Sequence, residues 1–270
     1  MSRSFTRAEI AALATIAVGL AMLLVTTLAA LADERLLRGV TIWSKPIKFA
    51  ASFSLHLATL VVFVRLLLPE VRAGWGAALV LLGASVATLI EVLYVALQAA
   101  RGRDSHFNTD TAWEAFMYYQ VMGGAALALV AVTVLTGVLV LRQARPDVSS
   151  GLRLGAGWGA ILGGVATLVV AGALASGVLT GPGPWIGEPR SDAGGLPLIG
   201  WSRQTGDLRV PHFFATHLIQ GMAIAGWLAD RLSFRPRFVV ALAAVLGLDV
   251  TVATFVQAVR GLPLIASLTP

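Results

Sequence analysis

Seven polar side chains that are costly to bury in hydrocarbon fall within long apolar stretches of this sequence, all toward the same end of those stretches. They are His56, Glu91, Gln98, His217, Gln220, Asp249 and Gln257. Ionisable residues inside membrane segments are rare, and they usually mark ligand sites, ion pathways or proton relays. The clustering predicts one polar pocket at a single depth, in which Glu91 and Asp249 are the candidate catalytic groups, acting as ligand, general base or charge partner.

Histidine is the second chemical signal. All four histidines, His56, His106, His212 and His217, lie in this half of the apolar stretches or in the adjoining loops. Imidazole is the commonest metal ligand in proteins and also an axial haem ligand. One hypothesis is a zinc, copper or iron site built from these histidines, as in a metal-dependent enzyme. Another is a b-type haem held between His56 and His217 in a membrane redox protein, with Arg101 and Arg260 pairing with its propionates.

The same pocket would also suit a protein without a cofactor. Protonatable Glu91 and Asp249, with histidine as a relay, are typical of a small-solute or proton-coupled transporter or of a sensor. Candidate helix breakers along a gated path are Gly123-Gly124, Gly163-Gly164 and Pro211. A purely structural alternative is a set of interhelical ion pairs, such as Glu91 with Arg260 or Asp249 with Arg101. The sequence leaves open whether the protein is an enzyme.

Composition identifies the setting of this pocket. The chain of 270 residues is 57% hydrophobic and only 13% charged, whereas ordinary soluble domains carry about 25% charged residues. These values predict an all-α, polytopic integral membrane protein in a lipid bilayer. The absence of cysteine excludes disulfides, thiolate metal sites, iron-sulfur clusters and covalent c-type haem. The net charge of +6 comes from scattered basic residues, which favours contact with anionic lipids over nucleic acid.

Apolar stretches long enough to cross the hydrocarbon, which takes about 20 residues, predict seven transmembrane helices in a single domain spanning residues 1–270. They lie near residues 10–32, 46–68, 75–100, 113–141, 155–180, 211–230 and 238–259. Seven crossings place the termini on opposite sides. Basic residues are denser in the short loops on the amino-terminal side, so we expect a cytoplasmic N-terminus in a bacterial inner membrane. The polar pocket would then open to the periplasm.

A weak internal repeat adds a prediction about topology. Gln98-Ala99-Ala100-Arg101-Gly102 ends the third stretch, and Gln257-Ala258-Val259-Arg260-Gly261 ends the seventh. Two parallel triplets of helices joined by the fourth helix would explain this similarity. The three-one-three count resembles sugar-efflux transporters of the SWEET type, although their sequence motifs are absent here.

Ser52-x-x-x-His56 resembles a motif of the seven-helix zinc amide hydrolases, the family of alkaline ceramidases and adiponectin receptors. That resemblance implies zinc chemistry with His56 as a ligand. The chain departs from the family at its second motif, because His212 and His217 are five residues apart rather than four. A retinal protein is excluded more firmly, since Lys45 and Lys48 are the only lysines and the last helix has none for a Schiff base.

Two loops on the pocket side are predicted to cover it. The first, residues 101–110, carries His106, and the second is a long loop at 181–210 that is rich in glycine and proline. The segments Trp43–Phe49 and Ser105–Asn108 have the unusual composition of a specific signature. We therefore expect a small-molecule ligand or substrate as partner. A homo-oligomer is a further possibility.

Overall fold

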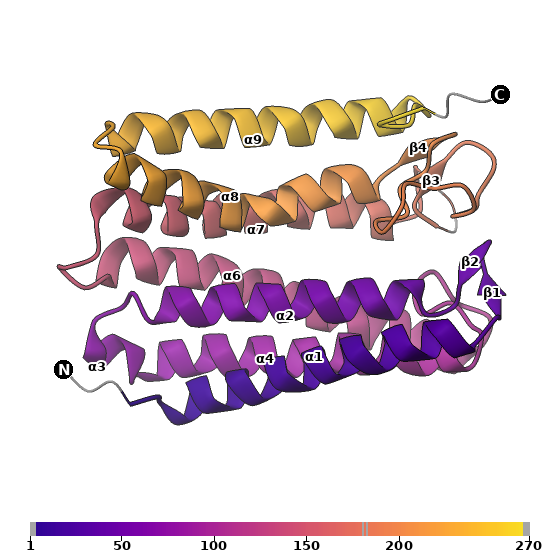
Figure 1. Ribbon diagram of the computed structural model, residues 1–270, viewed down its shortest axis with the longest axis horizontal. Coiled ribbons are helices and arrows are strands. Elements are labelled where there is room, and N and C mark those ends of the chain that lie inside the picture. The colour runs from indigo at the N-terminus through magenta and orange to yellow at the C-terminus, as the bar shows by residue number, and fades with distance from the viewer. Residues whose placement is uncertain (1–3, 180, 182, 267–270) are drawn as a thin grey trace.

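The computed structural model describes residues 4–179, 181 and 183–266, and long antiparallel helices dominate it (Figure 1). The long helices are α1 (Arg7–Ala32), α2 (Ser44–Val64), α4 (Trp75–Ala100), α6 (Gly123–Gln143), α7 (Ser150–Ala175), α8 (Arg209–Arg231) and α9 (Pro236–Val259). Short helical elements are α3 (Pro69–Arg72), α5 (Ala112–Phe116) and the π-helical turn η1 (Met117–Met122). Two small hairpins pair β1 (Leu36–Leu37) with β2 (Val40–Thr41), and β3 (Trp185–Ile186) with β4 (Gly206–Asp207).

Within the described residues, six helical segments are long and apolar enough to cross a membrane. They are α1, α2, α4, the continuous run Ala112–Gln143 made by α5, η1 and α6, then α7 and α9. These helices indicate an integral membrane protein in contact with lipid, which confirms the predicted all-α membrane bundle. Helix α8 falls outside this set because His212, His217, Gln220 and charged ends make it the most polar long helix. The seventh crossing therefore stays a prediction.

The predicted helix positions agree closely with the structure, and the differences have local causes. Residues 75–100 match α4 at both ends. Helix α2 ends at Val64, four residues early, because the chain turns there toward Pro69, which begins α3. Helix α7 lies five residues earlier than the predicted 155–180, since its first turn begins at Ser150 and Gly177 adopts a positive φ of 65° beyond its end. Residue 180 lies outside the described residues.

The long helices form two groups on either side of α6 (Figure 1). Helices α1, α2 and α4 pack against one another, and so do α7, α8 and α9. Helix α6 contacts α4 in the first group and α7 in the second. The two ends of the chain lie at opposite ends of the bundle, and the loops that follow α4 and α7 meet at the end away from the N-terminus (Figure 1).

Glycine controls the packing of α7 against α8. Gly151, Gly155, Gly159 and Gly163 recur every four residues along the face of α7 that meets α8. A methyl group added at Gly159 would lie 3.0 Å from the Leu218 carbonyl oxygen, and one at Gly163 would lie 3.2 Å from that of Ala215. Small residues at this spacing let membrane helices approach closely. Gly163, considered above as a helix breaker, is thus a packing contact.

This ladder gives a prediction about stability. In Gly155→Ala the new methyl group would collide with the Met222 carbonyl oxygen on α8, so we expect a loss of about 1–3 kcal/mol. Gly172→Ala is the matched control on the same helix, because no heavy atom lies within 4 Å of its added methyl group. Alanine favours helix over glycine by up to about 1 kcal/mol, so the control should be neutral or stabilising. Equal unfolding midpoints for the two variants in detergent would contradict the close packing.

Candidate functional site

Glu91 and His106 form the centre of the candidate site. Glu91 lies on α4 with 3% of its surface exposed, and its Oε2 accepts no hydrogen bond in the described part of the chain. His106 lies in the loop after α4, where its Nδ1 is 3.1 Å from the Ser105 hydroxyl and its Nε2 is 4.0 Å from Glu91 Oε2. A buried carboxylate oxygen without a hydrogen bond is uncommon and often marks a binding or catalytic position.

Three elements surround this pair with aromatic and basic groups. Phe49 on α2 meets the His106 ring edge-on, with centroids 5.4 Å apart, and Lys45 Nζ lies 5.5 Å from the centre of the Phe49 ring. Tyr118, carried by η1, lies 5.8 Å from the other side of His106. Lys45 also interacts electrostatically with Glu91. We call these five residues, Lys45, Phe49, Glu91, His106 and Tyr118, the Glu91 cluster.

The two signature segments of the sequence therefore meet in space. Lys45 and Phe49 come from the segment 43–49, and His106 comes from the segment 105–108. Burial beside Lys45 and His212 lowers the pKa of His106 well below its ordinary value. At pH 7 its ring is neutral, so Nε2 is able either to donate a hydrogen bond toward Glu91 or to accept one from a ligand.

A second polar group lies deeper, between α2, α6 and α8. His56 Nε2 is 3.0 Å from the Thr133 hydroxyl on α6. His217 Nδ1 is 3.2 Å from Gln220 Oε1, and Gln220 in turn donates to Thr59 on α2 at 3.1 Å. We call His56, Thr59, Thr133, His217 and Gln220 the histidine row. It joins the two groups of helices through side-chain hydrogen bonds, and His56 interacts electrostatically with His217.

His212 lies between the two groups. It is in the first turn of α8, its Nδ1 is buried without a hydrogen-bond partner in the described residues, and it interacts electrostatically with both His106 and His217. The protonatable side chains are therefore arranged in sequence from the loop end of the bundle to the middle of α2 and α8. Even so, no group of three or more His, Asp and Glu side chains among the described residues is arranged to hold a metal ion.

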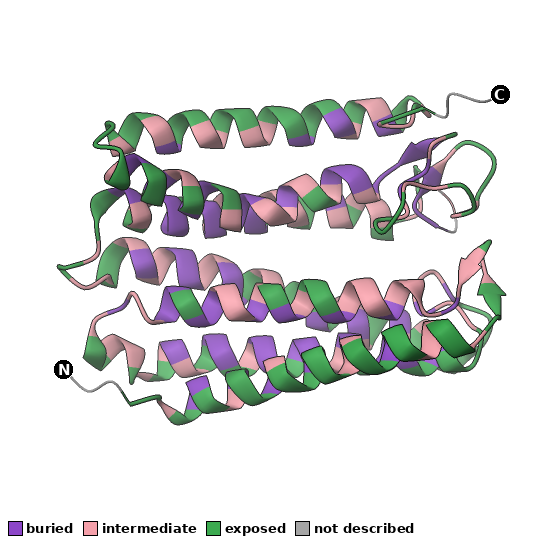
Figure 2. Ribbon diagram, in the orientation of Figure 1, coloured by how far each residue is buried: buried purple, intermediate pink, exposed green. Residues whose placement is uncertain are grey.

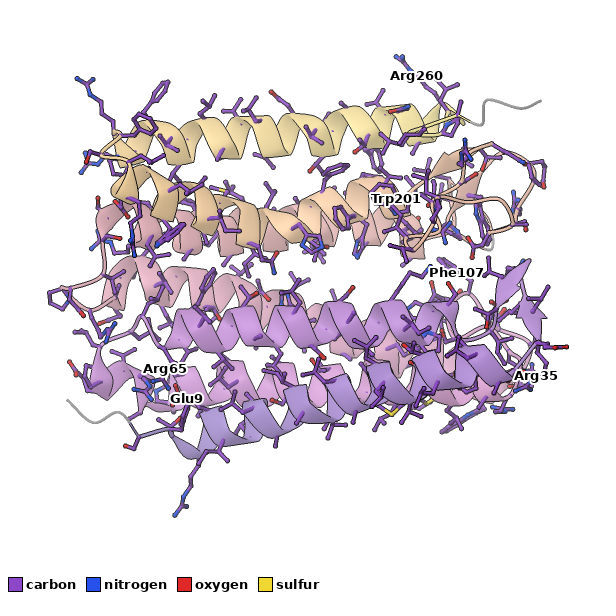
Figure 3. The ribbon with its side chains drawn as sticks, in the orientation of Figure 1. Glu9, Arg35, Arg65, Phe107, Trp201 and Arg260 are labelled. Carbon is purple, nitrogen blue, oxygen red and sulfur yellow. The ribbon has the colours of Figure 1, made fainter. Side chains whose placement is uncertain are left out.

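Other predicted site residues lie elsewhere. Arg101 donates to Gln98 Oε1 at 2.7 Å, and Gln98 donates to Glu114 Oε1 at 3.3 Å, so both belong to a network that ties the loop after α4 to α5. Asp249 and Arg260 are exposed on α9, and Arg260 points away from the bundle (Figure 3). The expectation that the polar face of α9 turns toward the bundle interior is wrong, because the interior face of α9 carries Thr251 and Thr254 instead.

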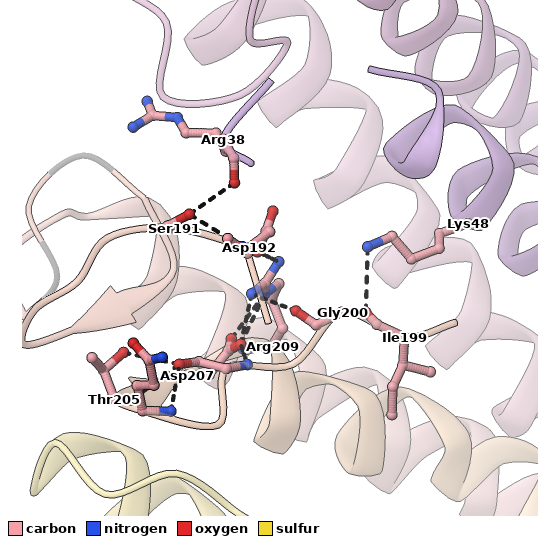
Figure 4. Close-up of polar contacts among 12 residues, drawn as sticks. Arg38, Lys48, Ser191, Asp192, Ile199, Gly200, Thr205, Asp207 and Arg209 are labelled. Carbon is pink, nitrogen blue, oxygen red and sulfur yellow. Dashed lines mark hydrogen bonds and ion pairs between the residues drawn. The ribbon is translucent and has the colours of Figure 1, made fainter. Parts of the chain in front are cut away.

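A tightly bonded roof covers this end of the bundle. We use the term roof for residues 33–43, 101–111 and 183–208. Its centre is Arg209, which contacts Asp207 Oδ2 and Asp192 Oδ1 at 2.7 Å each and donates to the Gly200 carbonyl at 3.1 Å (Figure 4). The Arg38 carbonyl accepts from the Asp192 amide, and Lys48 on α2 donates to the Ile199 carbonyl at 3.3 Å. The roof thereby joins both groups of helices.

Tryptophans are part of the roof interior. Trp185 and Trp201 are buried, and Arg209 lies 5.4 Å from the Trp185 ring. Phe107 and Trp201 both lie at this end of the bundle, above α2 and α8 respectively (Figure 3). The two predicted loops therefore do cover the polar half of the helices. The prediction missed Lys45 and Phe49, whose four-residue spacing at the start of α2 was the available signal.

The bundle and its covered polar end define the broad class of the molecule, a helical integral membrane protein with protonatable groups buried beneath one set of loops. No protein-family model, curated protein or solved structure matches the chain. Its function is therefore argued from the residues alone.

Proposed function

We propose that this protein is a proton-coupled membrane transporter for a small polar solute, with the Glu91 cluster as its binding site. The observation that carries the proposal is the buried Glu91 carboxylate, which has an unbonded Oε2 and faces a neutral histidine 4.0 Å away. Buried carboxyl groups with histidine neighbours are typical components of proton relays in transporters. The solute would contact Glu91 and His106 and stack against Phe49 or Tyr118.

The proposal includes a full crossing by α8 and an orientation. Helix α8 packs along α7 and α9, and a polar face turned toward the bundle interior would make its crossing tolerable. Seven crossings would form two parallel triplets around α6, with the N-terminus in the cytoplasm of a bacterial cell and the roof in the periplasm. Conversion between outward and inward access would then be a movement of one triplet against the other, with the histidine row at their contact.

The test uses purified protein in phospholipid vesicles that contain a pH-sensitive dye. Amino acids, carboxylates, primary amines and hexoses are added separately, and the internal pH is recorded. We expect one of these classes to change the internal pH in protein-containing vesicles and not in empty vesicles. Solute uptake without any proton movement would contradict the coupling, and no uptake or binding of any class would contradict the transport function.

A second candidate is a membrane redox protein with b-type haem between His56 and His217. The specific observation in its favour is that these rings come from the facing helices α2 and α8 and interact electrostatically. Two histidines are sufficient for haem, so the proposal does not need a cluster of metal ligands. A visible spectrum of the purified protein tests it directly, because bound haem gives a Soret band. Elemental analysis of the same sample tests for zinc, copper or iron bound by His56, His106, His212 or His217.

A further inference from the structure

Helix α9 is the outermost helix of its group and is covered on one side only. Its buried residues, Val240, Thr251, Thr254 and Ala258, face α7, α8 and the roof. Most of its remaining surface is exposed along its whole length (Figure 2). An exposed apolar helix in a membrane protein requires no explanation by itself, because lipid covers it. The pattern of side chains on this face is more specific.

The exposed face of α9 carries a regular heptad stripe. Its members are separated by alternating steps of three and four residues, and they are Leu242, Val245, Asp249, Val252, Val256 and Val259. The five apolar members are each between 37% and 60% exposed. Alternating steps of three and four place side chains on the seam by which two helices supercoil around each other. We call these six residues the α9 stripe.

Asp249 is the only polar member of the α9 stripe, and it lies near the middle of the membrane. It is thirteen residues from Pro236 and ten from Val259, which corresponds to about 20 Å and 15 Å along the helix. A carboxyl group facing lipid at this depth costs about 3 kcal/mol or more. No basic side chain follows or precedes it within two helical turns on α9, so its partner has to come from outside the described bundle.

We propose that the α9 stripe is a homodimer interface in which Asp249 contacts Asp249 of a second copy of this chain. Two copies inserted in the same orientation are related by a two-fold axis along the membrane normal, so a residue on that axis meets its own equivalent. Two carboxyl groups there hydrogen-bond through a shared proton and need no basic partner. A single polar residue in a heptad seam also fixes the register of the two helices.

A cysteine cross-linking experiment tests this interface, and the chain is well suited to it because it contains no cysteine. Val252→Cys places one thiol on the stripe, one helical turn from Asp249. Val86→Cys is the matched control, since Val86 is 58% exposed near the middle of α4 on another face of the bundle. Both proteins are placed in phosphatidylethanolamine and phosphatidylglycerol vesicles, diluted with excess lipid and oxidised. We expect a disulfide-linked dimer for Val252→Cys and monomer for Val86→Cys.

The role of Asp249 is tested in the Val252→Cys background. Asp249→Leu removes the polar contact and should weaken dimerisation by about three- to tenfold, the range for interhelical hydrogen bonds in membranes. Asp249→Asn keeps hydrogen-bonding groups and should retain most of the cross-linked dimer. Equal cross-linking of Val252→Cys and Val86→Cys would overturn the interface. Undiminished cross-linking of the Asp249→Leu protein would overturn the contact between the two carboxyl groups.

Discussion

Replacing Arg209 with alanine should destabilise the folded protein by about 3–5 kcal/mol, the usual result of removing one partner from a buried ion pair. The Arg209 guanidinium contacts two carboxylates, and Asp207, which is 1% exposed, would be left with a buried charge and no counter-ion. The loss would also release the Gly200 carbonyl and the Trp185 ring, so three separate parts of the roof would lose a common contact. Denaturant unfolding in mild detergent measures the effect.

Arg145→Ala is the matched control for this experiment. Arg145 pairs with Asp147 at 3.4 Å, but Asp147 is 63% exposed and the pair lies in the loop before α7. Exposed pairs contribute about 1 kcal/mol or less, so its unfolding free energy should differ little from that of the wild type. If the two variants unfold at the same denaturant concentration, the roof does not depend on Arg209.

Hydropathy was sufficient to locate the helices because a membrane crossing needs a long apolar run, and such runs are visible without structural context. It was less informative for α8, whose histidines and glutamine lower its apolarity while still occupying one face. The sequence also identified the end of the bundle at which polar groups gather. Depth along a helix follows directly from counting residues, since each residue adds about 1.5 Å.

Direction around the helix axis was the part that counting could not provide. The spacing of Asp249 and Arg260 shows that they share a broad face of α9, yet it does not say which side of α9 meets α8. That choice depends on packing, and Gly247, Thr251 and Thr254 take the interior side. Gln98 and Arg101 were placed at the correct depth, but their hydrogen bonds go to the loop network rather than to a pocket.

The structure also shows why Glu91 and His106 were harder to connect from the sequence. His106 lies in a loop, and the turn that places it over Glu91 requires Phe107 at a positive φ of 58° and contacts from Tyr118. Tyr118 reaches this position from the π-helical turn η1, which shifts side-chain directions relative to a regular α-helix. Local deviations of this kind have no simple hydropathy signal.

The strongest functional prediction concerns Glu91→Gln. Glutamine keeps the size and hydrogen-bonding capacity of the side chain, but it can neither carry a negative charge nor exchange a proton. If solute movement is coupled to protonation of Glu91, the variant should show no solute-driven change of internal pH in dye-loaded vesicles. Solute binding, followed by tryptophan fluorescence of the roof, should persist at a reduced level, because Phe49, His106 and Tyr118 remain in place.

Glu70→Gln controls for the general effect of removing a carboxylate. Glu70 is exposed in α3, at the opposite end of the bundle from the Glu91 cluster, and its replacement should leave proton movement at the wild-type level. Because Glu91 Oε2 accepts no hydrogen bond from the described residues, Glu91→Gln should also keep a wild-type unfolding temperature. Wild-type proton coupling in Glu91→Gln would exclude Glu91 as the coupling group. A loss of coupling accompanied by unfolding would instead assign Glu91 to stability, so the two measurements together decide whether this buried carboxyl group performs transport or holds the helices together.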